Sequence, residues 1–331
     1  MAAIRGGVFT RADARACGYE DAAIDYLLQC GSWRRVSRGT YALRRLLFVV
    51  SDEMVYLRRS YGLLSGARPG LVASHQSAAG LYGLPLWGLD LSAVHVTTGA
   101  GRAGRVADGV HRHVCALPAE HVHTWNRLPL VSPARAVAEV AATARSEAAV
   151  VCVDAAMHAG LVNRRSLEFA ARALPAGAPE AERTIGAATG TAGSVGESRL
   201  RYHLRAAGLP EPSSQPGPPD VQPREYDVPS LWFPDERTVV EFEPWQLYWH
   251  DYRDDDADGL RPDPSAYDGP PAVEHVWVSW ADMDHPDLVV ERVRTAFARA
   301  AARSGVRQFD PTRRRRRRRP RPVPDDGGVP C

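Results

Sequence analysis

Apolar positions in the first 45 residues recur first with a helical period and then with the alternation of strands. Thr10 followed by Asp13 is a capping-box variant and predicts a helix that ends before Gly18. Apolar residues at positions 22, 23, 24, 27 and 28 predict the buried face of a second helix. The stretch "SWRRVSRGTYAL", residues 32–43, alternates like two strands around a turn. Two helices followed by a hairpin predict a winged helix-turn-helix over residues 1–45.

The next 150 residues change pattern twice. Residues 46–175 predict a mixed α/β segment, with helices at 50–64, 73–86, 132–144 and 147–160 and strands at 93–99 and 109–117. Residues 176–195 are rich in Gly, Ala, Thr and Pro and offer little to bury, so they predict a linker between domains.

The last third of the chain predicts another α/β domain over residues 196–305 and then a tail. A helix at 196–208, a hairpin within 226–244, a strand at 273–283 and a long helix at 286–305 are expected. Seven consecutive arginines repel one another and cannot pack, so residues 306–331 predict a disordered basic tail. The fold class expected for the whole chain is α+β.

Composition narrows the function without deciding it. The chain has 331 residues with 44% hydrophobic and 24% charged content, which is ordinary for a globular protein. No apolar run approaches the roughly 18 residues of a membrane helix, and the first residues lack an apolar signal core, so we expect a cytoplasmic protein without a membrane partner. The five scattered cysteines form no C-x-x-C pair, and all 41 basic residues are arginine. A site that requires lysine therefore cannot operate in its usual form.

Acidic residues gather in "YDVPSLWFPDERTVVEFEP". Glu241 and Glu243 lie at alternate positions of a predicted strand and so share one face, while Asp227 opens the neighbouring strand. With Glu197 on the preceding helix, they predict a carboxylate site that holds Mg²⁺ or Mn²⁺, with Asp227 and Glu241 as the main ligands. The alternative is the solvated acidic face of a hairpin.

The blocks "GESRLRYHLRAAGLPEPSSQ", "REYDVPSLWFPDERTVVEFEPW" and "VWVSWADMDHP" resemble the very-short-patch-repair-like endonuclease domains of actinobacterial proteins. This resemblance implies a PD-(D/E)xK, restriction-endonuclease-like fold in which Glu197, Asp227 and Glu241 match the acidic positions. The chain departs from the pattern beside the site. Glu243-Pro244 stands where the family has Asp-Gly, and "DYRDDDADGLRPDPSAYDGPP" replaces the following helix.

The front of the chain, "FTRADARACGYEDAAIDYLLQCGSWRRVSRGTYAL", resembles the winged-helix domain of AbiEi-type antitoxins from type IV toxin–antitoxin systems. The likeness continues through "ASHQSAAGLYGLPL", "AVHVTTG" and "LPLVSPARAVAEVA". It implies a DNA-binding regulator with DNA and a cognate toxin as partners. Arg34, Arg35 and Arg38 would then present the wing to phosphates or a minor groove, or form a solvated basic turn. Glu20 and Asp21 would face phosphates poorly.

Three further patterns carry weaker chemistry. Asp254, Asp256 and Asp258 fit the start of a calcium loop, but Ser265 stands at its twelfth position, so a solvated acidic loop is favoured. Histidines and a cysteine alternate at positions 111, 113, 115, 121 and 123, which suggests either a metal site or surface histidines on strand ends. The arginine tail could bind nucleic-acid phosphates or stay solvated.

Together these patterns leave three classes of function. The leading hypothesis is a DNA-binding, antitoxin-like regulator that carries a degenerate nuclease-like domain. The alternatives are a Mg²⁺-dependent DNA endonuclease and a protein-interaction scaffold. The acidic insert at 251–271, beside the predicted site, weighs against the endonuclease.

Overall fold

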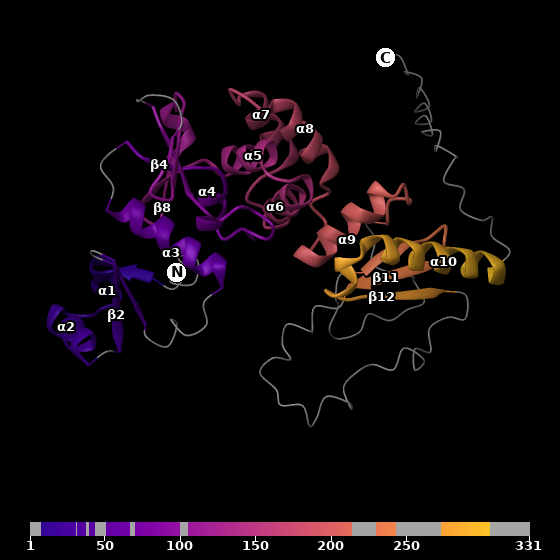
Figure 1. The fold of residues 1–331 in the computed structure, drawn as a ribbon, viewed down its shortest axis with the longest axis horizontal. Coiled ribbons are helices and arrows are strands. Elements are labelled where there is room, and N and C mark those ends of the chain that lie inside the picture. Colours follow the sequence, from indigo (N-terminus) through magenta and orange to yellow (C-terminus); the bar gives the residue numbers. More distant parts are fainter. Residues whose placement is uncertain are drawn as a thin grey trace, which may run out of the picture.

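The computed structural model of the chain describes residues 8–30, 32–37, 40–43, 51–66, 70–99, 105–213, 230–242 and 273–304. Within these residues the fold is mixed α/β, with three sheets that follow one another along the chain. Figure 1 shows the N-terminal sheet, then a larger sheet with helices beside it, then a C-terminal sheet covered by α9 and α10. The predicted α/β character is confirmed at this level.

The N-terminal unit contains the predicted helices and hairpin: β1 (Val8–Thr10), α1 (Arg11–Ala16), α2 (Asp21–Gln29), β2 (Trp33–Ser37) and β3 (Thr40–Leu43). Thr10 and Asp13 form the predicted capping box, each side chain accepting the backbone N–H of the other. Gly18 follows α1 with a φ of 89°, which suits glycine. The sequence did not predict β1, which pairs antiparallel with β3 and gives the sheet order β1-β3-β2.

This small sheet packs on both of its faces. On one side, Trp33 contacts Phe9 edge-to-face at 4.7 Å between ring centroids and joins Ile24 of α2 in a small core. On the other side, Val8 and Ala42 belong to the large core of the following segment. The N-terminal unit is therefore held between its own helices and the middle of the chain.

The middle segment is built on a sheet of mixed direction with the order β6-β7-β5-β4-β9-β8. Its elements are α3 (Asp52–Ser65), β4 (Val72–Ala73), α4 (His75–Leu81), β5 (Val94–Thr98), β6 (Arg105–Ala107), β7 (Val110–Val114), the short 3₁₀ helix η3 (Ala119–His121), β8 (Val122–Trp125) and β9 (Leu128–Val131). Strands β5 and β7 run parallel, as neighbours. Asn126 and Arg127 both take positive φ in the two-residue turn between β8 and β9, a hairpin that the sequence did not predict.

Next comes a group of helices packed on one alanine-rich core: α5 (Pro133–Thr143), α6 (Ser146–His158), α7 (Arg164–Arg172) and α8 (Ala178–Ala187). The prediction of a linker with little to bury at 176–195 is wrong where α8 lies. Ala181 and Ile185 are buried there, and the Thr184 hydroxyl donates to the Ala141 carbonyl at 3.2 Å. Small residues, which made this segment look like a linker, allow α8 to pack closely on α5.

The C-terminal unit consists of α9 (Val195–Ala206), β10 (Ser230–Phe233), β11 (Thr238–Phe242), β12 (Glu274–Val278), the 3₁₀ helix η8 (Asp282–Asp284) and α10 (Pro286–Ser304). Strands β10 and β11 form the predicted hairpin, and β12 adds to β11 in parallel. Helix α9 packs on two sides, because Leu200 and Leu204 belong to the core of this unit while Tyr202 packs against the core of α5–α8.

Candidate nucleic-acid interface and candidate metal centres

Helix α2 offers an outward face that could meet DNA. Ile24 is buried and fixes the inner side of the helix, whereas Ala22, Tyr26 and Gln29 are exposed. Tyr26 keeps 66% of its surface exposed, which is unusual for a large aromatic side chain in a small unit. Figure 1 shows α2 at the edge of the N-terminal unit, away from the large sheet.

Acidic residues on α2 are paired with arginines of α1. Arg11 contacts Asp21 at 2.7 Å and Asp25 at 2.8 Å, and Arg15 contacts Asp21 as well. Hydrogen bonds from Arg15 and Arg11 lower the pKa of Asp21 to about 2. The sequence suggests that Asp21 would repel phosphates, but these ion pairs cancel much of its charge locally.

The predicted DNA-contacting arginines lie on β2. Arg34 stands opposite Ala42 and Arg35 opposite Tyr41, so the two side chains project from opposite faces of the sheet. Both are exposed, and the Arg35 guanidinium lies 5.9 Å from the centre of the Tyr41 ring. Arg38 lies outside the described residues. The side chains of Arg34 and Arg35 can therefore make contacts only on opposite faces of the hairpin.

Asp13 fixes the N-terminal unit on the middle segment. Its carboxylate accepts a hydrogen bond from the Tyr61 hydroxyl of α3 at 3.0 Å, and Arg127 of the β8–β9 turn approaches it at 3.5 Å. The same carboxylate closes the capping box of α1. One partly buried acid thus holds α1, and with it α2, against the middle segment.

Glu197, expected in the carboxylate site, caps its own helix. It is 2% exposed; one carboxylate oxygen accepts the Gly193 N–H at 2.9 Å and the other accepts from Arg201 Nε at 3.2 Å. Its backbone N–H donates to the Ser194 hydroxyl. Each carboxylate oxygen already accepts one hydrogen bond, so a metal ion would have to share these contacts, and the role of Glu197 as a ligand stays a prediction.

Glu241 lies on β11, half-buried, opposite Ser230 of β10 and Trp277 of β12. The start of α9 is close to this end of β11, because a Cβ on Gly196 would come within 2.1 Å of the Phe242 ring. Asp227 and Glu243 lie outside the described residues, so the convergence of the acids on one metal ion stays a prediction.

Histidines gather where α4 meets β5 and β7. His75, His95 and His113 can each direct one ring nitrogen to a common point, and these nitrogens lie within 4.8 Å of one another. His111 stacks on His113, with 4.1 Å between the ring centres. Of the alternating residues singled out in the sequence, His111 and His113 take part in this cluster.

The remaining residues of that alternating set lie elsewhere. The thiol of Cys115 lies 3.4 Å from the Arg135 guanidinium, and His121 and His123 are not part of the group. His75 and His95 were missed because they lie 38 and 18 residues before His113, and only the fold brings them together.

Comparison with known proteins bears on the first of these sites. Residues 1–44 match the family model of the AbiEi antitoxin transcriptional regulators. This match covers α1, α2 and the hairpin, so it confirms the predicted resemblance for the N-terminal part of the chain and fits the winged-helix arrangement seen there. No curated protein gives a significant match to the chain. The nuclease-like resemblance of residues 196–305 remains a prediction.

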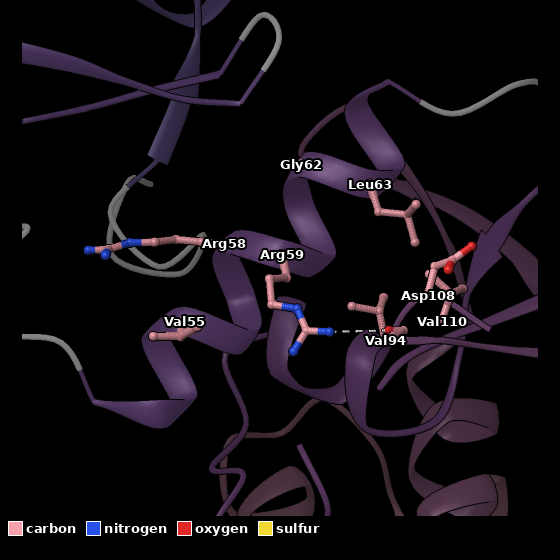
Figure 2. A pocket seen from close by; sticks show the side chains of 9 residues that line it. Val55, Arg58, Arg59, Gly62, Leu63, Val94, Asp108 and Val110 are labelled. Atoms are coloured by element: carbon pink, nitrogen blue, oxygen red, sulfur yellow. Dashed lines mark hydrogen bonds between the residues drawn. The ribbon is translucent and has the colours of Figure 1, made fainter. Parts of the chain in front are cut away.

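A cavity of about 400 Å³ lies in the middle segment, between α3 and strands β5 and β7. Figure 2 shows Val55, Arg58, Arg59 and Leu63 of α3 on one side and Val94, Asp108 and Val110 on the other. Arg59 donates to the Gly109 carbonyl at 3.4 Å. Gly109 has a φ of 70°, which favours glycine, and a Cβ there would displace the end of the Arg59 side chain, which it would meet at 2.3 Å.

Two weaker predictions fall outside the described residues, namely the acidic calcium-like loop at 254–265 and the arginine tail at 306–331. The helices that are described include none of the length and apolarity needed to span a membrane.

Proposed function

We propose that the chain is a DNA-binding transcriptional regulator of the antitoxin type, whose winged-helix unit contacts DNA. The observation that carries this proposal is the match of residues 1–44 to the antitoxin regulator family, together with the exposed polar face of α2 in that same stretch. A short helix with an exposed aromatic and an amide side chain suits insertion into a major groove.

In this proposal Gln29 reads base edges and Tyr26 packs against bases or sugars. Glutamine pairs well with adenine, and an exposed tyrosine gives contact area at low entropic cost. Arg34 or Arg35 of β2 contacts phosphates, and Arg38, outside the described residues, is proposed to add a further contact. The arginines of α1 hold Asp21 and Asp25 in ion pairs and so reduce repulsion at the DNA surface.

Fluorescence anisotropy with duplex DNA from the region upstream of the chain's own gene would test this. We expect Gln29→Ala to weaken specific binding by about 10-fold, equivalent to about 1–2 kcal/mol of base discrimination. Arg34→Ala and Arg35→Ala, made separately, should each reduce the slope of log affinity against log salt by about one if that arginine contacts a phosphate.

Phe169→Ala is the matched control, because Phe169 is an equally exposed aromatic residue on α7, far along the chain. Binding should survive EDTA. Loss of binding in the Phe169 variant, or a Gln29→Ala variant that discriminates among sequences as well as the wild type does, would contradict recognition through α2.

The alternative function is a Mg²⁺-dependent endonuclease that uses Asp227, Glu241 and Glu243. Incubating supercoiled plasmid with the protein, with Mg²⁺, Mn²⁺ or EDTA, separates the two functions. Metal-dependent nicking that Asp227→Ala abolishes would favour the endonuclease, whereas intact plasmid that is shifted on a gel would favour the regulator.

The family description also leads us to propose a cognate toxin as protein partner, encoded next to this gene. Co-expression of the chain with its neighbouring gene product and purification of a stoichiometric complex would support this. Separate elution of the two proteins would count against it.

A further inference from the structure

We propose that His75, His95 and His113 form a binding site for one divalent transition-metal ion, with Zn²⁺ as the expected occupant. One nitrogen from each ring lies within 4.8 Å of the others, and His95 Nδ1 is 3.0 Å from His113 Nε2. Ligand nitrogens around a tetrahedral zinc ion are about 3.3 Å apart, so the rings must rotate out of their present stacking for all three nitrogens to reach one ion. This site is distinct from the proposed DNA-contacting surface and from the predicted carboxylate site.

The fold brings these rings together with a strained backbone. His75 is the first residue of α4 and has a φ of 50°, which few residues other than glycine adopt. Its ring stacks on that of His113, with 3.9 Å between centres. His95 on β5 is the register partner of His111 on the parallel strand β7. Strain of this kind persists where surrounding structure enforces it, and it is common at functional sites.

His75 also has the outer partner that metal-binding histidines usually have. Its Nδ1 lies 3.1 Å from the Ser74 hydroxyl and 3.3 Å from a Glu139 oxygen. The same Glu139 oxygen accepts the His75 backbone N–H at 3.0 Å, and Arg135 holds the other oxygen at 2.9 Å. This arrangement directs the second ring nitrogen, Nε2, toward the ion, as in carboxylate–histidine–zinc groups.

Without metal, His95 stands in a short chain of hydrogen bonds. Gln76 Nε2 lies 3.0 Å from His95 Nε2, and it also donates to the Asp90 carbonyl at 2.9 Å. A donor at His95 Nε2 places the proton on Nδ1, facing His113. A metal at Nδ1 requires the ring proton on Nε2, where the Gln76 amide oxygen accepts it only if the amide turns over and gives up its hydrogen bond to the Asp90 carbonyl.

The cluster also offers the access that an ion needs. His75 is buried, whereas His95 and His113 are only half-buried, so the cluster is reached from solvent on the side of these two rings. His111 stacks on His113.

The test is to strip the full-length protein with EDTA, dialyse it, and titrate it with Co²⁺ and Zn²⁺. We expect about one ion per chain, a visible cobalt spectrum of tetrahedral nitrogen ligation without a thiolate band, and a higher Tm on binding. His95→Gln and His113→Gln should each weaken affinity by at least about 100-fold. Glu139→Gln should weaken it by about 10–100-fold, since it removes an outer partner.

His123→Gln is the matched control, because His123 lies on β8, outside the group, and its substitution should leave affinity unchanged. Far-UV circular dichroism of each stripped variant shows whether it folds, and a variant that fails is replaced by the milder His95→Asn. Absence of stoichiometric binding to folded wild-type protein would overturn the proposal. Binding that His95→Gln and His113→Gln leave intact would overturn it as well.

Discussion

At the scale of single residues, Gly196 shows how one missing side chain sets the distance between two elements. A Cβ at this position would come within 2.1 Å of the Phe242 ring, which is itself almost fully buried. Gly196→Ala should therefore destabilise the protein by about 1–3 kcal/mol through overpacking between α9 and β11. Urea unfolding followed by tryptophan fluorescence measures this.

Gly186→Ala is the matched control for that substitution. Gly186 is exposed on α8 and a Cβ there meets nothing within 4 Å, so the change should be neutral or stabilising by up to about 1 kcal/mol. Equal effects of the two substitutions would show that helix propensity, and not contact with Phe242, decides the role of Gly196.

The roles of single residues were harder to predict from the sequence than the helices and strands were. Thr10 and Asp13 were predicted because a capping box is a local pattern, and local patterns survive folding. Glu197 also matches an acidic motif, but in the fold its carboxylate accepts the Gly193 N–H at the start of α9. The histidine cluster could not be predicted, because alternation on one strand identifies His111 and His113 and says nothing of residues on α4 and β5.

At the scale of elements, a chain of hydroxyl and amide groups joins α3, α4 and β5. The Tyr56 hydroxyl on α3 lies 2.5 Å from the Ser77 hydroxyl on α4, which accepts the His95 N–H of β5 at 2.7 Å. Burial raises the pKa of Tyr56 to about 12, with the Ser77 contact acting slightly in the opposite direction. The fold therefore favours the neutral phenol over the phenolate.

This predicts a loss of stability at alkaline pH. A tyrosine in the unfolded chain ionises near pH 10, so the contribution of Tyr56 is full below about pH 10 and is lost as pH rises toward 12. Tyr56→Phe should cost about 1 kcal/mol at pH 8 and give a shallower decline above pH 10. Urea midpoints at pH 8 to 11.5 measure both effects. Burial also raises the pKa values of Tyr82 and Cys152. The stability that these two groups lose at alkaline pH is the same in the wild type and in the Tyr56→Phe variant. Parallel curves would contradict the role of Tyr56.

Elements were predicted well where periodicity was strong. The helices found at α3, α5, α6, α9 and α10, and the hairpin of β10 and β11, lie close to their predicted positions. Helix α8 was missed because alanine and glycine give a weak hydrophobic pattern, although alanine favours helices. Strand β1 was missed because three residues are too few to show alternation, and its pairing with β3 is a tertiary contact.

At the scale of the whole molecule, packed contacts cross the boundary predicted at residue 45 and the linker predicted at 176–195. Val8 and Ala42 share a core with Tyr61 and Leu130, across the boundary predicted at residue 45. Asp154 of α6 accepts hydrogen bonds from Thr189, Gly190 and Ser198, across the predicted linker. Arg199 of α9 pairs with Glu147 of α6 at 2.8 Å and stacks over Trp87 at 4.1 Å. These contacts indicate that the N-terminal, middle and C-terminal parts of the chain depend on one another for stability.

This dependence can be tested at the first boundary with Tyr61→Phe. The substitution removes the hydrogen bond to Asp13 and should cost about 1 kcal/mol. If residues 8–43 and the large sheet unfold together, hydrogen exchange should accelerate alike in β3 and in β9, because both open only with the shared core. Tyr26→Phe, an exposed tyrosine on α2, is the control and should leave both unchanged. Faster exchange confined to residues 8–43 would mean that the N-terminal unit opens by itself, independently of the large sheet.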